Sequence, residues 1–280
     1  MNAKPIYKSP AGEQAVMALY ESALARWPAP YDALTVPTRH GDTFVIACGD
    51  LTAPPLVLLH GAGTNSAIWA GDIGDYSRRF RVYAADLPGE PGRSAPNRPA
   101  WDSPAYADWL EDVFGALKID RAALIGISQG GWTALKFATR QPERVRQLVL
   151  ICPGGVIPDR LSFVLRAIAY SLLGRRGVKG IVRLTFGDQV VPDGVEEIMA
   201  VIMRHFKPRM GILPRFTDDD LRCLTMPTLL IGGGQDALRN NERIAARLRA
   251  LLPNLGVIII PAAGHAVLNT REPILAFLSV

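Results

Sequence analysis

The pentapeptide Gly126-Ile127-Ser128-Gln129-Gly130 constrains the fold more than any other stretch of the sequence. It follows a short apolar run that starts at residue 122, and it precedes a helix-like segment over residues 133–140. A strand, a tight turn and a helix form the context in which Gly-x-Ser-x-Gly holds a serine hydroxyl above a sheet. The glycines let neighbouring backbones close over the strained turn. The alternative is a glycine-rich turn with a capping serine, and the partners of Ser128 decide between the two.

Predicted strands and helices alternate over most of the chain, which indicates a mostly parallel sheet covered on both faces. The expected strands cover residues 34–36, 44–48, 55–60, 81–85, 122–127, 147–151, 227–232 and 256–260, with helices at 11–26 and 104–117. The alternation stops in one region, where only helical patterns occur (residues 161–173, 178–186 and 195–206). We therefore predict a core over residues 1–156 and 225–280, and a helical cap inserted at residues 157–224.

A serine hydroxyl needs a base within hydrogen-bond reach to act as a nucleophile. The chain has four histidines, His40, His60, His205 and His265. Only His265 comes directly after the last predicted strand, in a loop that shares the carboxyl edge of the sheet with Ser128. This position predicts His265 as the general base; the alternative is a loop histidine with a structural hydrogen bond.

The base in turn needs a carboxylate on its other nitrogen. Asp236 follows the predicted strand next to the one that leads to His265, and Asp86 is the rival at another strand end. The Leu-Pro-Gly that follows Asp86 favours a loop-fixing role for that residue. The chain order Ser128, Asp236, His265 is also the order described for this type of turn.

Backbone amides must stabilise the negative charge of a tetrahedral intermediate. The loop His60-Gly61-Ala62-Gly63 follows an early strand and carries small residues, so its backbone can approach a substrate closely. We predict that the N–H groups of Ala62 and Gln129 form the oxyanion hole. His60, Gly61 and Gly63 are expected to support this loop rather than to react.

Charge and cysteine usage exclude several classes of function. The net charge of +5 is spread along the chain with no basic block, which disfavours a nucleic-acid partner. Cys48, Cys152 and Cys223 are widely spaced, so neither a metal site nor a disulfide is expected and a reducing cytoplasm fits. The chain start leads into no signal-peptide pattern, and the apolar stretch 161–173 is too short to span a bilayer.

With these motifs in place, the chain resembles the α/β-hydrolase superfamily from about residue 31 to its end. The likeness rests on His60-Gly61-Ala62-Gly63, Asp86-Leu87-Pro88-Gly89, Gly126-Ile127-Ser128-Gln129-Gly130-Gly131, Gln141-Pro142-Glu143-Arg144-Val145, Gly233-Gly234-Gln235-Asp236 and Gly264-His265. Within the superfamily the chain is similar to small bacterial carboxylesterase-like proteins with a helical cap. The resemblance implies an eight-stranded sheet, no cofactor and hydrolysis through an acyl-enzyme. One departure is the extra Glu90-Pro91 in the loop after Asp86.

Three functions remain open. The first is a serine hydrolase that cleaves small to medium carboxylic esters. The second uses the same triad for carbon–carbon bond hydrolysis, lactone opening, perhydrolysis or acyl transfer. The third is a ligand-binding or receptor role on the same scaffold. The expected partner is a small-molecule ester, and the oligomeric state stays open between a monomer and a homodimer. The candidate pocket residues are Trp69, Trp132, Met199, Met203 and Phe206.

Overall fold

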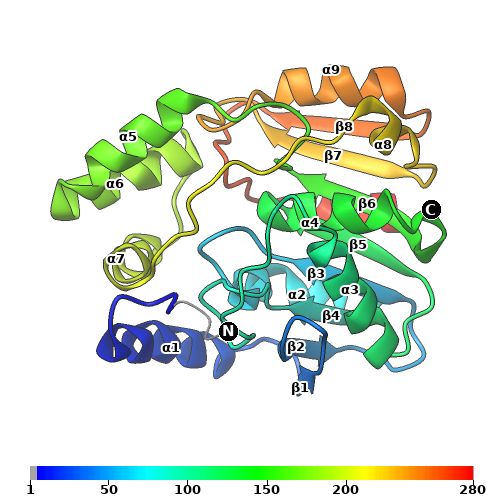
Figure 1. Cartoon of the computed structure of the whole chain (residues 1–280), viewed down its shortest axis with the longest axis horizontal. Helices are drawn as coiled ribbons and strands as arrows, with labels where there is room; N and C mark the ends of the chain where they lie inside the picture. Colours follow the sequence, from blue (N-terminus) through cyan, green and yellow to red (C-terminus); the bar gives the residue numbers. More distant parts are fainter. Residues whose placement is uncertain (1–4, 280) are drawn as a thin grey trace.

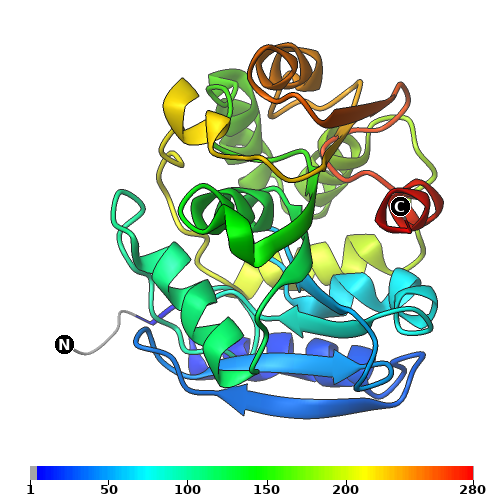
Figure 2. The same cartoon turned by 90° about the vertical axis from the view of Figure 1, so that its right-hand side faces the viewer.

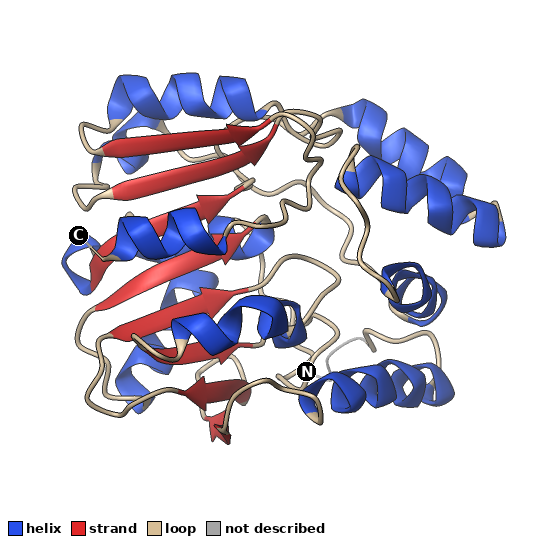
Figure 3. Ribbon diagram, turned by 180° about the vertical axis from the view of Figure 1, so that it is seen from behind, coloured by secondary structure: helices blue, strands red, loops and turns tan. Residues whose placement is uncertain are grey.

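The computed structural model describes residues 5–279 and contains one eight-stranded sheet in the order β1-β2-β4-β3-β5-β6-β7-β8 (Figures 1 and 3). Only β2 runs antiparallel to its neighbours β1 and β4, and every other pairing is parallel. The mostly parallel sheet implied by the resemblance is confirmed. The strands are β1 Tyr31–Val36, β2 Thr43–Cys48, β3 Pro55–Leu59, β4 Arg81–Ala85, β5 Ala122–Ile127, β6 Val145–Ile151, β7 Thr228–Gly233 and β8 Leu255–Ile260.

Helices cover both faces of the sheet (Figure 2). Val57 and Leu59 of β3 belong to a core cluster shared with helices α3, α4 and α9, whereas Leu56 and Leu58 belong to a second cluster shared with α2 and α10. Both faces of β3 are thus buried, as a continuous apolar run requires. The helices are α1 Pro10–Leu24, α2 Ala70–Tyr76, α3 Ala105–Ala116, α4 Gln129–Ala138, α5 Leu161–Ser171, α6 Gly174–Phe186, α7 Val195–His205, α8 Asp218–Arg222, α9 Asn241–Leu251 and α10 Arg271–Leu278.

The segment between β6 and β7 carries α5, α6, α7 and α8 and forms none of the eight strands. Figure 3 shows α5, α6 and α7 beyond the end of the sheet toward which the parallel strands point. Phe216, Leu221 and Leu224 are buried in the core cluster of α3 and α4 instead. The division at residues 157–224 stays a prediction, and we propose that the cap ends before Phe216.

The N-terminal segment packs on the same cap. The Lys8 N–H donates to the His205 carbonyl at 2.8 Å, and the Lys207 N–H donates to the Ile6 carbonyl at 2.8 Å. The rings of Tyr7 and Phe206 meet edge to face, with centroids 6.0 Å apart. Helix α1, predicted at residues 11–26, also packs on α7, which the sequence pattern did not indicate.

The three cysteines and the lengths of the helices bear on disulfide bonding and membrane crossing. Cys48, Cys152 and Cys223 are free thiols, the first two buried and the third exposed. Within residues 5–279, no helix has both the length and the apolar character needed to cross a bilayer.

Candidate active site

Ser128 occupies the turn between β5 and α4 in a strained backbone conformation. Its φ of 54° and ψ of −107° lie in a region that non-glycine residues rarely adopt. The Ser128 N–H donates to the Ile151 carbonyl at 2.9 Å, and the Ser128 carbonyl accepts from the Gly154 N–H at 3.1 Å. These bonds to β6 and the loop after it hold the turn in place. Strain of this kind costs about 1–3 kcal/mol and is typical of functional sites.

The flanking glycines make the turn possible because no side chain fits at either position. A Cβ on Gly126 would lie 2.5 Å from the Gly130 carbonyl oxygen, and a Cβ on Gly130 would lie 2.2 Å from the Leu59 carbonyl oxygen. Both obstacles are backbone atoms, which cannot rotate away. The first residues of α4 are thereby pressed against β3 and β5.

We expect Gly130→Ala to lower the free energy of unfolding by more than about 3 kcal/mol, because β3 must move to admit the methyl group. Gly74→Ala in α2 is the matched control, since a Cβ there meets no atom within 4 Å. The control should be neutral or stabilising by up to about 1 kcal/mol. Chemical denaturation of both variants measures the difference, and equal stabilities would contradict this account of the turn.

A chain of two hydrogen bonds links Ser128 to His265 and His265 to Asp236. The His265 Nε2 lies 2.9 Å from the Ser128 Oγ, and the His265 Nδ1 lies 2.9 Å from the Asp236 Oδ2. The three residues come from the loops after β5, β7 and β8, as the sequence predicted. Both the serine and the carboxylate are buried, and His265 is mostly covered.

The Asp236 carboxylate is surrounded by donors. Its Oδ1 accepts from the Leu238 N–H at 2.8 Å and from the Arg239 N–H at 3.0 Å, and its Oδ2 accepts from the Asn241 Nδ2 at 3.0 Å. Burial alone would raise the pKa of this carboxyl, but His265 and the backbone amides outweigh burial and hold the pKa well below its usual value. Asp236 therefore stays ionised beside His265 at neutral pH.

The loop of residues 60–63 lies against the serine. A Cβ on Gly61 would sit 3.6 Å from the Ser128 Cβ. Within residues 5–279, the N–H groups of Ala62 and Gln129 donate to no protein acceptor. Free amides beside a serine are what an oxyanion hole requires. Their assignment to that role remains a prediction.

His60 braces this loop through both ring nitrogens. Its Nε2 accepts from the Leu87 N–H at 2.8 Å, so its Nδ1 carries the proton and donates to the Gly61 carbonyl at 2.8 Å. Burial lowers the pKa of His60, which keeps the ring neutral in this arrangement. The contacts are those of a loop-supporting residue.

Comparison with known proteins decides the family. Residues 56–278 match the model of the family described as "Alpha/beta hydrolase family". The chain belongs to this family. This α/β hydrolase is 34% identical over 263 residues to "Uncharacterized carboxylesterase nap" of Bacillus subtilis (strain 168), covering 91% of this chain and 87% of the relative.

Two further similar proteins are also named as carboxylesterases. "Carboxylesterase YbfK" of the same strain is 33% identical over 266 residues, which cover 91% of this hydrolase and 88% of the relative. A crystal structure of naproxen esterase (carboxylesterase NP) from Bacillus subtilis superposes with a TM-score of 0.83 at 30% identity, covering 97% of this chain and 98% of the other.

Arg239 is a charged residue of the site that sequence reasoning missed. Its Nη1 donates to the Ser128 Oγ at 3.0 Å and to the Cys152 carbonyl at 2.9 Å, and its Nε donates to the Asp159 Oδ1 at 2.6 Å. Because the Ser128 Oγ accepts a hydrogen bond from Arg239, its own proton is directed to His265. The only sequence signal was a basic side chain three residues after the predicted acid.

Glu90 is a buried carboxyl in the loop after β4. Its Oε2 accepts from the Gly63 N–H at 2.6 Å, so it fixes the loop that leads past Ser128. Burial raises the pKa of Glu90 to about 7, against the opposing effects of the Gly63 N–H and the Arg98 and Arg209 guanidinium groups. The extra Glu90-Pro91 thus supports the predicted oxyanion loop.

This pKa predicts a pH-dependent stability that Glu90→Gln removes. Between the ordinary value of 4.5 and about 7, the folded hydrolase holds a proton that the unfolded chain has released. The contribution of Glu90 to stability is therefore full at low pH and decreases, by about 3 kcal/mol in total, as pH rises through this window. Denaturation of both proteins over roughly pH 4 to 8, the range in which the two protonation equilibria differ, measures the difference. If the free energies of unfolding of the wild type and of Glu90→Gln changed with pH in the same way, the predicted role of Glu90 would be wrong.

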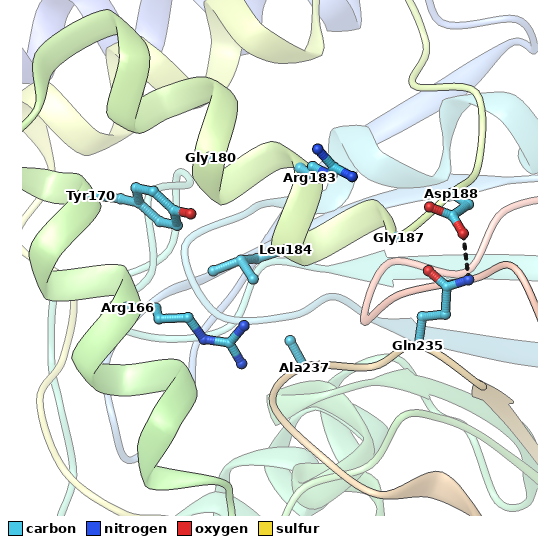
Figure 4. Close-up of a pocket in the computed structure, with 9 residues that line it drawn as sticks. All are labelled: Arg166, Tyr170, Gly180, Arg183, Leu184, Gly187, Asp188, Gln235 and Ala237. Carbon is cyan, nitrogen blue, oxygen red and sulfur yellow. Dashed lines mark hydrogen bonds between the residues drawn. The ribbon is translucent and has the colours of Figure 1, made fainter.

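A cavity of about 400 Å³ opens between α5, α6 and the loop after β7 (Figure 4). In that loop, Gln235 and Ala237 flank Asp236, and the Gln235 Nε2 donates to the Asp188 Oδ2 at 2.6 Å. The cavity therefore lies beside the triad loop, on the cap side. Its lining residues are Arg166, Tyr170, Gly180, Arg183, Leu184, Gly187, Asp188, Gln235 and Ala237.

None of the five candidate pocket residues lines this cavity. Trp69 and Trp132 are covered by the two core clusters, and Phe206 is covered by the N-terminal segment. These three side chains are packed in the interior, and a pocket role for them stays a prediction. Met199 and Met203 are half-buried against α6 in the cap, and for them a pocket role remains a prediction.

Three groups of metal-binding type also meet at this site. Ligand atoms of Cys152, Asp236 and His265 lie within 4.8 Å of one another. Both His265 nitrogens and both Asp236 oxygens are already hydrogen bonded, and the Arg239 guanidinium adjoins the Cys152 carbonyl. A cation would have to displace these bonds, so the donor set does not fit a metal.

Proposed function

We propose that this α/β hydrolase cleaves carboxylic esters of small to medium size through an acyl-enzyme on Ser128. The observation that carries the proposal is the line from the Ser128 Oγ to the His265 Nε2 and from the His265 Nδ1 to Asp236, with both distances 2.9 Å. The relatives named as carboxylesterases support an ester as the substrate. A serine nucleophile fits attack on a carbonyl carbon.

In the acylation half of the reaction, the His265 Nε2 accepts the Ser128 proton as the Oγ attacks the ester carbonyl. The N–H groups of Ala62 and Gln129 stabilise the oxyanion. Asp236 stabilises the imidazolium, since its carboxylate is ionised and hydrogen bonded to the Nδ1. The imidazolium then protonates the departing alkoxide, which leaves as the alcohol, and Ser128 carries the acyl group.

In the deacylation half, water takes the place of the alcohol. His265 accepts a proton from the water as its oxygen attacks the acyl carbon, and the same amides stabilise the second oxyanion. The proton then returns to the Ser128 Oγ, which releases the carboxylic acid.

Arg239 is proposed as a positioning residue for the first step. Its hydrogen bond to the Ser128 Oγ leaves the serine proton directed at His265, and its charge favours the developing alkoxide. The Asp159 carboxylate, 2.6 Å from the Arg239 Nε, compensates the buried cation.

The test combines a substrate panel with covalent labelling. p-Nitrophenyl esters from acetate to decanoate are assayed beside a lactone, a dienoic ketone and an acyl-transfer acceptor, and a fluorophosphonate adduct is measured by intact mass. Ester turnover together with one adduct supports the proposal. Turnover of only the lactone or ketone, or tight ligand binding with neither turnover nor adduct, would overturn it.

A further inference from the structure

Helix α5 leaves one apolar face uncovered. Leu161, Leu165, Ile168 and Leu172 are 70%, 60%, 49% and 80% exposed. Their spacing of four, three and four residues places them on one side of the helix. Arg166 and Tyr170, on the opposite side, line the cavity toward α6. Large apolar side chains gathered in this way mark an interaction surface.

The charge around this face has a single sign. Between Arg160 and Gly187 the sequence contains six basic residues and no carboxylate (Arg160, Arg166, Arg175, Arg176, Lys179 and Arg183). Arg175, Arg176 and Lys179 are exposed, and none of the three forms an ion pair among residues 5–279. All three lie in the first two turns of α6, and two residues separate α6 from the end of α5 at Ser171.

We propose that the outer face of α5 docks on an anionic lipid surface, with Arg175, Arg176 and Lys179 contacting the phosphate headgroups. An exposed apolar helix face bordered by cations is the pattern of proteins that lie in the membrane interface. Figure 1 shows α5 at the outer edge of the molecule, beyond α6, where a flat surface can reach it. Its length suits lying on a bilayer and not crossing it.

A second copy of the chain fits this face less well. In a two-fold symmetric dimer the same patch meets itself, so the arginines of one α5–α6 hairpin would face those of the other. Like charges brought together in this way weaken association. A phosphate-rich surface supplies the opposite charge, and this favours lipid as the occupant.

Docking would also place the candidate active site near the lipid. Asp159 and Arg160 directly precede α5; Asp159 pairs with Arg239, and the Arg160 N–H donates to the Leu238 carbonyl at 2.8 Å. The start of α5 is therefore tied to the loop that carries Asp236.

The experiment measures co-sedimentation with phosphatidylcholine vesicles that contain or lack phosphatidylglycerol. We expect binding only with phosphatidylglycerol, decreasing as salt increases. Leu165→Ser/Leu172→Ser should weaken binding by roughly tenfold or more, because two large apolar groups leave the interface. Leu51→Ser/Val190→Ser is the matched control, since both side chains are highly exposed outside α5.

A second pair of variants tests the charge. Arg175→Glu/Arg176→Glu should abolish binding, whereas Arg243→Glu/Arg249→Glu on α9 changes the net charge equally and should retain it. Equal binding by the α5 variant and its control would overturn the proposal, as would no binding by the wild type. A concentration-dependent dimer lost in the leucine variant would also overturn it, in favour of a second copy.

These measurements do not depend on the catalytic proposal, because Ser128→Ala should bind vesicles as well as the wild type does. Failure of vesicle binding leaves the ester assay unaffected, and failure of the ester assay leaves vesicle binding unaffected.

Discussion

Ser128→Ala is expected to reduce ester hydrolysis by about 10⁴-fold or more, because the acyl-enzyme can no longer form. The variant should also lose its fluorophosphonate adduct. Its free energy of unfolding should stay close to that of the wild type, since the Ser128 backbone bonds to Ile151 and Gly154 do not involve the hydroxyl. Initial rates on a p-nitrophenyl ester, intact mass and thermal denaturation measure the three effects.

Ser162→Ala is the matched control, because Ser162 is exposed on α5 and its hydroxyl forms no hydrogen bond with the side chains of Ser128, Asp236 or His265. It should keep both full activity and the adduct. A Ser128→Ala protein that still hydrolysed the ester at the wild-type rate would show that another group carries the reaction.

Asp236→Asn is expected to lower kcat by about 10³–10⁴-fold with little change in fold. An amide cannot stabilise the imidazolium, and its NH₂ group can turn toward the Nδ1 and force the proton onto the Nε2, where it blocks proton transfer from Ser128. In the wild type, the Asn241 side chain and two backbone amides donate to the Asp236 carboxylate. The carbonyl oxygen of an asparagine can keep part of these hydrogen bonds, so the fold should change little. Kinetics across a range of pH measure the effect.

Asp86→Asn provides the comparison, since Asp86 was the rival candidate for the acid. Its carboxylate accepts from the Tyr20 hydroxyl at 3.0 Å and from the Ser66 and Arg93 N–H groups, each at 2.8 Å. We expect this variant to lose stability but to retain kcat within about tenfold, because a loop-fixing residue acts through folding. The reverse ranking of the two variants would make Asp86 the acid.

The sequence located Ser128, Asp236 and His265 because each follows a strand, and the carboxyl ends of parallel strands share one edge of the sheet. A short apolar run ending in glycine or a polar residue is a local signal, so it can be read without knowing the rest of the fold. The helix after the serine was predicted from residue 133, but α4 begins at Gln129. Gly130 and Gly131 disfavour a helix in isolation, and packing against β3 and β5 overrides that preference.

The interactions that the sequence did not predict are long-range and lack a local pattern. The bond from Arg239 to Ser128 joins residues 111 positions apart, and nothing in the neighbourhood of Arg239 indicates a buried guanidinium. Trp132 is a candidate pocket residue by sequence, but no local pattern gives the direction of its side chain. It points into an aromatic cluster with Trp101 and Tyr106, a direction that depends on the packing of α3.

The pairing of the N-terminal segment with α7 also bears on how the chain reaches this structure. The bridge between Tyr7 and Phe206 joins the first described residues to a helix near the last quarter of the sequence. During synthesis the N-terminal segment emerges first and must wait, with the apolar side chains of Ile6, Tyr7 and Val16 uncovered, until α7 has been made. Closing so long a loop is slow relative to local contacts. We therefore expect the cap to be completed late in folding, with the segment before α1 exposed to proteases and to aggregation until then.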